Sequence, residues 1–198
     1  MSGAEFHGDR LVVHREPNEL DLLATRFSEI LSTVGISHVF VSGYVAILTG
    51  RARGTEDIDV LIERVTDRKV EQLVSKLKNG GLWGPAMPLD SMSELLEDNI
   101  WIAPEGEMIP HIELKFATDE YDRASLQNSI VAELRAIDVE VPVGPLELQV
   151  AYKLHLGTQK DFEDAVHLHS LFEENLSTVE LERWVETLGV EDMYDRLR

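Results

Sequence analysis

The sequence DIDVLI, at residues 57–62, places two aspartates where an apolar strand is expected to enter the core. Side chains alternate between the two faces of a strand, so Asp57 and Asp59 point the same way, whereas both isoleucines and the valine point into the core. The rise per residue separates the two aspartates by about 7 Å along the strand. Together they can bind a hard divalent cation, because Mg²⁺ prefers a few carboxylates with phosphate oxygens. A solvated strand end is the alternative for an isolated pair.

Residues upstream of this strand favour a ligand over a solvated strand end. Ser42 and Gly43 lie between an apolar strand expected at residues 38–41 and the start of a short helix. Small residues at such a turn let backbone amides approach an anion at the start of a helix. Arg51 and Arg53 then add guanidinium groups, which suit phosphate oxygens, just before the two acids. This order of residues predicts a site for a metal and a phosphate.

A third acid follows in the sequence MIPHIELKF, where a strand is expected at residues 109–116. Glu113 stands between two apolar residues, and alternation puts His111 and Lys115 on the same face. These polar neighbours predict a cleft beside Glu113. An edge strand with its outer face in solvent would give the same pattern.

The rest of the first two thirds of the chain alternates between helical and strand patterns. Apolar residues recur at helical spacing between Asn18, a capping residue, and Gly35, and a further helix is expected from Thr66. An edge strand is expected near residues 11–13 and a weaker strand at residues 137–143. Residues 82–107 indicate only a short helix, near residues 92–97.

The last third of the chain has only helical patterns. Three helices are expected after Pro145, the last of them opened by the capping box Ser177–Glu180. We therefore predict an α/β (α+β) fold in which a mixed β-sheet is flanked by helices. The core is expected over residues 1–144, and a C-terminal helical segment over residues 145–198.

The charge balance restricts the function. Thirty-seven acidic residues oppose eighteen basic ones, giving a formal net charge of −19. Halophiles use such a self-repelling surface, so a salt-rich cytoplasm is one interpretation and an acidic mesophilic protein is another. Non-specific nucleic-acid binding through a basic face is disfavoured.

Composition also indicates the compartment. Cysteine is absent, which excludes disulfides and thiolate metal sites. No apolar run approaches the roughly 18 residues of a membrane span, and no signal peptide is visible. We therefore expect a cytoplasmic protein without a membrane partner.

The segment from Val39 to Ile62 resembles the signature of the DNA polymerase beta-type nucleotidyltransferase superfamily. That signature is an apolar strand, a pair of small residues, a short helix and an acid-apolar-acid strand. The form GR.R.T.DID, which here runs from Gly50 to Asp59, is similar to small prokaryotic members found as toxins of toxin–antitoxin pairs. The resemblance covers roughly residues 20–172 and implies a nucleotidyltransferase core.

The resemblance implies a role for each matching residue. Asp57 and Asp59 would bind metal ions, and Glu113 would be the third carboxylate, which activates the attacking hydroxyl. Ser42 and Gly43 would hold the triphosphate of an incoming nucleotide. Two residues depart from the usual pattern, because Ser42 stands in place of a glycine and Glu113 in place of an aspartate. Further nucleotide-binding residues of the motif are Arg51, Arg53 and Thr55.

The segment LELQVAYKLHLGTQKDFEDAVHL, residues 146–168, is similar to the helices that follow the core in the toxin-like members. There a lysine on one helix, and a Lys-Asp-x-x-Asp start of the next, face the nucleotide. The matching residues are Lys153, Lys160, Asp161 and Asp164. Their sequence context leaves alternatives open, because Lys153 either reaches solvent or pairs with an acid. Acids at a helix start also favour the positive end of the helix dipole.

Residues and resemblance together predict a metal-dependent nucleotidyltransferase, which moves a nucleoside monophosphate from an NTP such as ATP to an acceptor hydroxyl. Its cofactor is expected to be Mg²⁺ or Mn²⁺, with two ions stabilising the entering and leaving oxygens. A tRNA, a protein or a small molecule could supply the hydroxyl. Two alternatives stay open. One is a catalytically degenerate member that binds nucleotide or a protein partner, and the other is a toxin component that pairs with an antitoxin.

Overall fold

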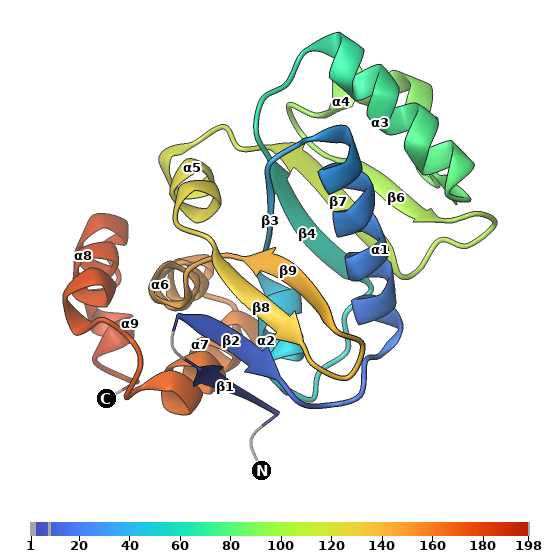
Figure 1. Cartoon of the computed structure of the whole chain (residues 1–198). Coiled ribbons are helices and arrows are strands. Elements are labelled where there is room, and N and C mark those ends of the chain that lie inside the picture. The colour runs from blue at the N-terminus through green and yellow to red at the C-terminus, as the bar shows by residue number, and fades with distance from the viewer. Residues whose placement is uncertain (1–2, 8, 198) are drawn as a thin grey trace.

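A mixed, twisted sheet runs through the molecule (Figure 1). The structure is a computed structural model that describes residues 3–7 and 9–197. In these residues the sheet has nine strands, in the order β1-β2-β8-β9-β3-β4-β7-β6-β5, and the pairs β2/β8, β3/β9 and β4/β7 are parallel. The strands are β1 (Ala4–His7), β2 (Arg10–Val13), β3 (His38–Val41), β4 (Asp57–Ile62), β5 (Leu82–Trp83), β6 (Ile100–Pro104), β7 (His111–Phe116), β8 (Ile130–Leu134) and β9 (Val139–Val143).

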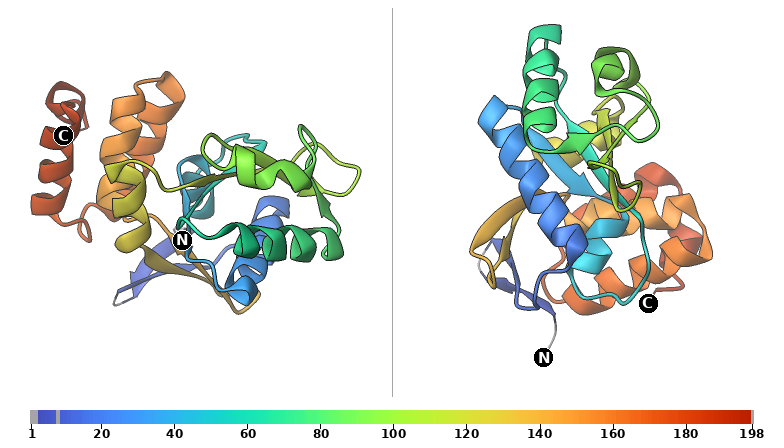
Figure 2. Two further views of the ribbon diagram at one scale, coloured as in Figure 1. Left: turned by 90° about the horizontal axis from the view of Figure 1, so that it is seen from above. Right: turned by 90° about the vertical axis from the view of Figure 1, so that its right-hand side faces the viewer.

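Helices cover the sheet and extend beyond one end of it. The long helix α1 crosses in front of the sheet in Figure 1, whereas α2 lies behind it. The C-terminal helices gather at one end of the molecule, as both views in Figure 2 show. The helices are α1 (Glu19–Val34), α2 (Gly43–Leu48), α3 (Asp67–Asn79), α4 (Met92–Leu95), α5 (Glu120–Gln127), α6 (Leu146–Leu156), α7 (Gln159–Phe172), α8 (Thr178–Leu188) and α9 (Glu191–Tyr194), with a 3₁₀ turn η1 (Leu89–Ser91) before α4.

The expected limits of α1 are confirmed, and they follow from its capping residues. The Asn18 side chain accepts a hydrogen bond from the Asp21 amide, and Asp21 accepts one from the Asn18 amide. This reciprocal pair satisfies two amides that have no partner within the helix. Gly35 ends the helix at φ 73°, in the left-handed region that glycine adopts without a steric penalty.

The strand at residues 57–62 is also confirmed, with the predicted alternation. Ile58, Val60 and Ile62 are fully buried, whereas Asp57 and Asp59 are half-buried on the opposite face. One hydrophobic cluster includes these strand residues together with residues of α1 and of α6–α9. The mixed α/β fold flanked by helices is therefore as expected, while a domain division at residue 144 stays a prediction.

Several weaker expectations about strands were wrong. The strand near residues 11–13 is not an edge, because β2 lies between β1 and β8. The strand expected from residue 109 begins at His111, since Pro110 has no amide hydrogen to donate. The strand expected from residue 137 begins at Val139.

The sequence patterns also missed β1, β5, β6, β8, α5 and α9. Strand β5 has only two residues and pairs with β6, whereas β8 pairs with the adjacent β9 and with β2, which is distant in the sequence. Within the described part of the chain, no helix has both the length and the apolar character that crossing a membrane requires.

Candidate active site

The parallel pairing of β4 and β7 brings three carboxylates together. Asp59 lies opposite Glu113 in the register, and Asp57 lies opposite His111. One carboxylate oxygen from each of Asp57, Asp59 and Glu113 lies within 4.8 Å of the others. Among the described residues, these three, called the carboxylate triad below, are the acids or histidines grouped closely enough to hold a metal ion.

The members of the triad repel one another. Burial raises the pKa of Asp59 to about 6, with further contributions from the negative charges of Asp57 and Glu113. Burial is the largest single influence on Asp57 and opposes its ionisation, but the hydrogen bond from Thr55, a backbone hydrogen bond and the charges of Lys160 and His111 together leave the pKa of Asp57 below its usual value. Asn99 and His111 lie beside Glu113, with nitrogen-to-oxygen distances of 3.4 and 3.5 Å. The triad therefore carries negative charge that neighbouring cations do not fully balance.

A divalent cation fits this arrangement. The three groups offer hard oxygen ligands, which Mg²⁺ and Mn²⁺ prefer. The raised pKa of Asp59 reports the cost of holding like charges together. A bound cation would remove that cost. Asp57, Asp59 and Glu113 are thus suited to hold a divalent metal ion.

The turn between β3 and α2 has an unusual backbone next to the triad. Ser42 has φ 62° and ψ −132°, a region that favours glycine. The Ser42 hydroxyl donates to the Asp59 carboxylate, which lowers the pKa of Asp59 against the larger effect of burial. The Ser42 amide donates to Gln149 Oε1 on α6 at 2.7 Å. Strained backbone of this kind persists where the surrounding structure enforces it, often at functional sites.

Gln149 is a site residue that the sequence reasoning missed. It is buried, and its amide group lies so close to Gly144 that a side chain there would come within 2.4 Å of Gln149 Nε2. The available signal was a polar residue in an otherwise apolar stretch of α6. Because buried amides need partners, that signal predicts a contact, but not that the partner is the turn at Ser42.

Arg53 lies directly over Gly43. A side chain added at Gly43 would come within 2.5 Å of Arg53 Nη2, so glycine leaves room for the guanidinium group in the place it occupies. Arg53 Nη2 also donates to Thr55 Oγ1 at 3.2 Å, and Thr55 donates to Asp57. The structure thus brings Gly43, Arg53 and Thr55, all expected from the sequence, to one side of the triad.

A buried aspartate on α7 forms ion pairs with three basic side chains. Asp164 is fully buried and pairs with Arg53 Nη1, with Arg51 Nε at 2.6 Å and with Lys153 Nζ at 3.2 Å. Arg51 also donates to Glu163 at 2.8 Å. We call Asp164 with Arg51, Arg53 and Lys153 the Asp164 cluster. Its cations are largely neutralised by acids of α7.

The sequence left open whether Lys153 reaches solvent or pairs with an acid, and the structure decides between the two. Its Nζ donates to Asp161 Oδ1 at 2.6 Å, so it pairs with acids and does not reach solvent. Thr158, and not Asp161, is the N-cap of α7, and its side chain accepts from the Asp161 amide. Lys160 is exposed. Burial raises the pKa of Asp57, whereas the Thr55 hydrogen bond and, to a smaller extent, the positive charge of Lys160 lower it.

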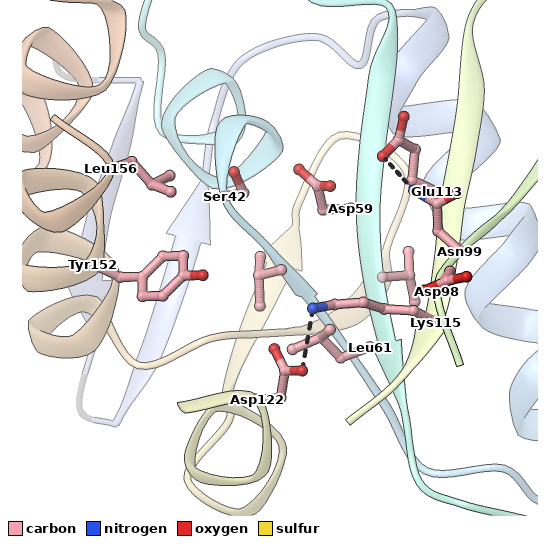
Figure 3. A pocket seen from close by; sticks show the side chains of 12 residues that line it. Ser42, Asp59, Leu61, Asp98, Asn99, Glu113, Lys115, Asp122, Tyr152 and Leu156 are labelled. Atoms are coloured by element: carbon pink, nitrogen blue, oxygen red, sulfur yellow. Dashed lines mark hydrogen bonds and ion pairs between the residues drawn. The ribbon is translucent and has the colours of Figure 1, made fainter. Parts of the chain in front are cut away.

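A cavity of about 500 Å³ opens beside the triad (Figure 3). Ser42, Asp59 and Glu113 stand along one part of it, and Tyr152 of α6 reaches in from the opposite wall. On its floor Lys115 Nζ pairs with Asp122 Oδ2 at 3.1 Å. The cavity is large enough for a small ligand next to the carboxylates.

Comparison with solved structures identifies the fold. An antigenic nucleotidyltransferase-like protein from Paracoccidioides brasiliensis superposes with a TM-score of 0.55 at 19% identity, over 90% of this chain and 92% of that one. At this identity the similarity establishes the fold alone. The chain therefore has a nucleotidyltransferase-like fold.

Two more distant structures also match. JHP933 from Helicobacter pylori gives a TM-score of 0.47 at 15% identity, over 92% of this chain and 78% of that one. A CCA-adding enzyme in complex with CTP gives 0.37 at 12% identity, over 92% of this chain and 50% of that one. Neither a scan against protein-family profiles nor a search of curated proteins finds a match.

Proposed function

We propose that this protein is a metal-dependent nucleotidyltransferase. The observation that carries the proposal is the carboxylate triad of Asp57, Asp59 and Glu113, grouped within 4.8 Å beside a cavity in a nucleotidyltransferase-like fold. Three acids held together, with neighbouring cations that do not fully balance them, are unfavourable unless a ligand compensates. A metal ion with a nucleoside triphosphate would provide that compensation.

The residues have distinct roles in the proposed reaction. When bound, Mg²⁺ or Mn²⁺ would supply positive charge to the α-phosphate and to the oxygens that enter and leave. Asp57, Asp59 and Glu113 would hold the metal. Glu113 also accepts the proton of the acceptor hydroxyl, whose oxygen bonds to the α-phosphorus as the bond to pyrophosphate breaks. The products are the acceptor nucleoside monophosphate ester and pyrophosphate.

The phosphates are proposed to bind at the turn and along α7. Ser42, Gly43, Arg53 and Thr55 lie on one side of the triad, and Lys160 is close enough to influence Asp57. Further proposed nucleotide-binding residues are Arg51, Lys153 and Asp161, which are ion-paired in this structure.

One observation favours a second function, in which the protein binds nucleotide or a protein partner without catalysis. The Asp164 cluster neutralises Arg51, Arg53 and Lys153, and the Ser42 amide is already bonded to Gln149. Fewer groups are then available to offset the charge of a triphosphate. The two functions differ in their products, because only the transferase releases pyrophosphate.

The acceptor and the biological role are extensions of the same proposal. The sequence resemblance to toxin-like members supports transfer to a tRNA or a protein, and a toxin role with an antitoxin partner. Labelling total cell extract with each radioactive NTP in the presence of Mg²⁺ would identify the acceptor by the band that gains label.

A thermal-shift experiment tests the metal site. Mn²⁺ or Mg²⁺ with NTP should raise the Tm through binding linkage, and replacing Asp57 and Asp59 together with Asn should abolish that shift. Pyrophosphate release with wild-type protein then separates the two functions. An unchanged metal-dependent shift in the double variant would place the metal elsewhere.

A further inference from the structure

A continuous chain of contacts connects helix α7 to the carboxylate triad. Asp164 on α7 accepts from Arg53 Nη1, Arg53 Nη2 donates to Thr55 Oγ1 at 3.2 Å, and Thr55 donates to Asp57. Asp164 and Asp57 are far apart in the sequence. The chain therefore joins the C-terminal helical segment to a candidate metal ligand through two intervening side chains.

We propose that Asp164 is a positioning residue for Asp57, acting through Arg53 and Thr55. The inference rests on the proposed metal-binding role of Asp57. Groups that hydrogen-bond to metal ligands orient them and tune their affinity for the metal. Asp164 supplies the fixed end of such a connection, because it is fully buried within α7.

The packing leaves Arg53 little freedom. Its side chain is only 8% exposed and fills the space over Gly43, where any side chain would collide with it. Its two terminal nitrogens are used in opposite directions, one toward Asp164 and one toward Thr55. A shift of Asp164 is therefore transmitted through Arg53 to Thr55. The Thr55 hydroxyl has a single hydrogen, which it donates to Asp57.

The charges explain why an acid is needed at this position. Arg51, Arg53 and Lys153 converge on Asp164, and a neutral residue there would leave three cations close together. Without that anchor, Arg53 would be attracted to the nearby triad and would compete with a metal ion for it. Asp164 thus keeps the Arg53 guanidinium group beside the triad, and the guanidinium group does not neutralise the three carboxylates.

Mn²⁺ affinity tests the inference without any need for catalysis. Free Mn²⁺ can be measured by electron paramagnetic resonance in titrations of wild-type protein, Asp164→Asn, Thr55→Val and the double variant. Each single change should weaken Mn²⁺ binding about tenfold. Because both act on one chain of contacts, the double variant should also lose about tenfold, and not the roughly hundredfold of independent sites.

Asp21→Asn is the matched control. Asp21 is also fully buried and is bound by an arginine, Arg15, at 2.6 and 2.9 Å, but it contacts no member of the triad among the interactions of the described residues. This variant should lose stability while keeping the wild-type Mn²⁺ affinity. Thr55→Ser, which keeps the hydroxyl, should restore the affinity lost in Thr55→Val.

The outcomes separate this inference from the proposed function. Wild-type Mn²⁺ affinity in a folded Asp164→Asn protein, or additive losses in the double variant, would overturn the positioning role alone. If Asp164→Asn does not fold, Arg53→Gln replaces it, and unchanged affinity in that variant has the same meaning. Absence of Mn²⁺ binding to wild-type protein would overturn the metal site and this inference with it.

Discussion

The carboxylate triad and the Asp164 cluster are neighbouring groups of charged residues with opposite balance. In the triad, three acids face one another and Asp59 is hard to ionise, with a pKa of about 6. In the Asp164 cluster, each cation has an acid of α7 as its partner. Charges that have partners of opposite sign within the fold need no ligand to stabilise them. Unsatisfied charges favour a ligand, so the comparison supports the proposed metal site at the triad.

The largest expected effect is on catalysis. Glu113→Gln keeps the size of the side chain but removes the base and a metal ligand, so the transfer rate should fall by about 10²–10⁴-fold. NTP affinity should change much less, because the phosphate contacts lie elsewhere. Single-turnover transfer and calorimetric titration at one salt concentration measure the two effects, with the exposed residue substitution Glu105→Gln as control. Full activity in Glu113→Gln would show that Glu113 is neither the base nor a required metal ligand.

The next largest effect is on the stability of the folded protein when a member of the Asp164 cluster, Lys153, is replaced. The sequence alone predicts that replacing Lys153 changes stability by no more than the surface range of about ±0.5 kcal/mol. The structure shows Lys153 buried between Asp161 and Asp164. Lys153→Met should therefore lower the free energy of unfolding by about 2–4 kcal/mol, since it leaves buried acids with fewer partners.

Urea denaturation measures this loss, and Lys160→Met is the control. Lys160 is exposed, so its replacement should stay within about ±0.5 kcal/mol. NTP affinity, which the resemblance predicts to fall about tenfold in Lys153→Ala, is measured by calorimetry with that alanine variant beside the wild-type protein. Equal stability of the two methionine variants would remove the distinction between the cluster and the surface.

A smaller effect concerns pH. In the metal-free protein the folded-state pKa of Asp59, about 6, lies above the usual value of 3.8. The folded state therefore binds the proton more tightly, and this contribution to stability is full below pH 4 and is lost as pH rises through 6. We expect a difference on the order of 1–3 kcal/mol between the two ends of that range.

Asp59→Asn isolates the effect of this one group, because its amide cannot ionise. The variant should be more stable than wild type at pH 7.5 without metal, and saturating Mn²⁺ should stabilise only the wild type. Urea midpoints at pH 4, 5, 6 and 7.5 provide the comparison. Parallel pH profiles for the two proteins would mean that the triad is not under charge repulsion.

The smallest expected effect is at the turn beside the triad. Ser42 has a backbone conformation that favours glycine, so Ser42→Gly should relieve strain and Ser42→Ala should not. Both lose the hydroxyl bonded to Asp59. The glycine variant should therefore be about 1 kcal/mol more stable than the alanine variant. Identical Tm values for the two variants would argue against strain at this turn.

Local sequence patterns determined much of the fold. The helix between Asn18 and Gly35 and the strand at residues 57–62 were predicted because capping and alternation depend on neighbouring residues. The same alternation predicted that Asp57 and Asp59 share a face. The two-residue strand β5 is too short to leave a sequence pattern, and β8 could not be placed in the sheet because one of its partners, β2, is distant in the chain.

The sequence by itself thus determined most of the candidate site residues, while the tertiary structure decided how their charges combine. The register of β4 with β7 puts Glu113 beside Asp59, and no local pattern contains that register. Folding α6 and α7 against the core buries Lys153 and gives Arg53 its partner in Asp164. The physical reason is that an electrostatic energy depends on distance and burial, and both are set by contacts between segments far apart in the chain.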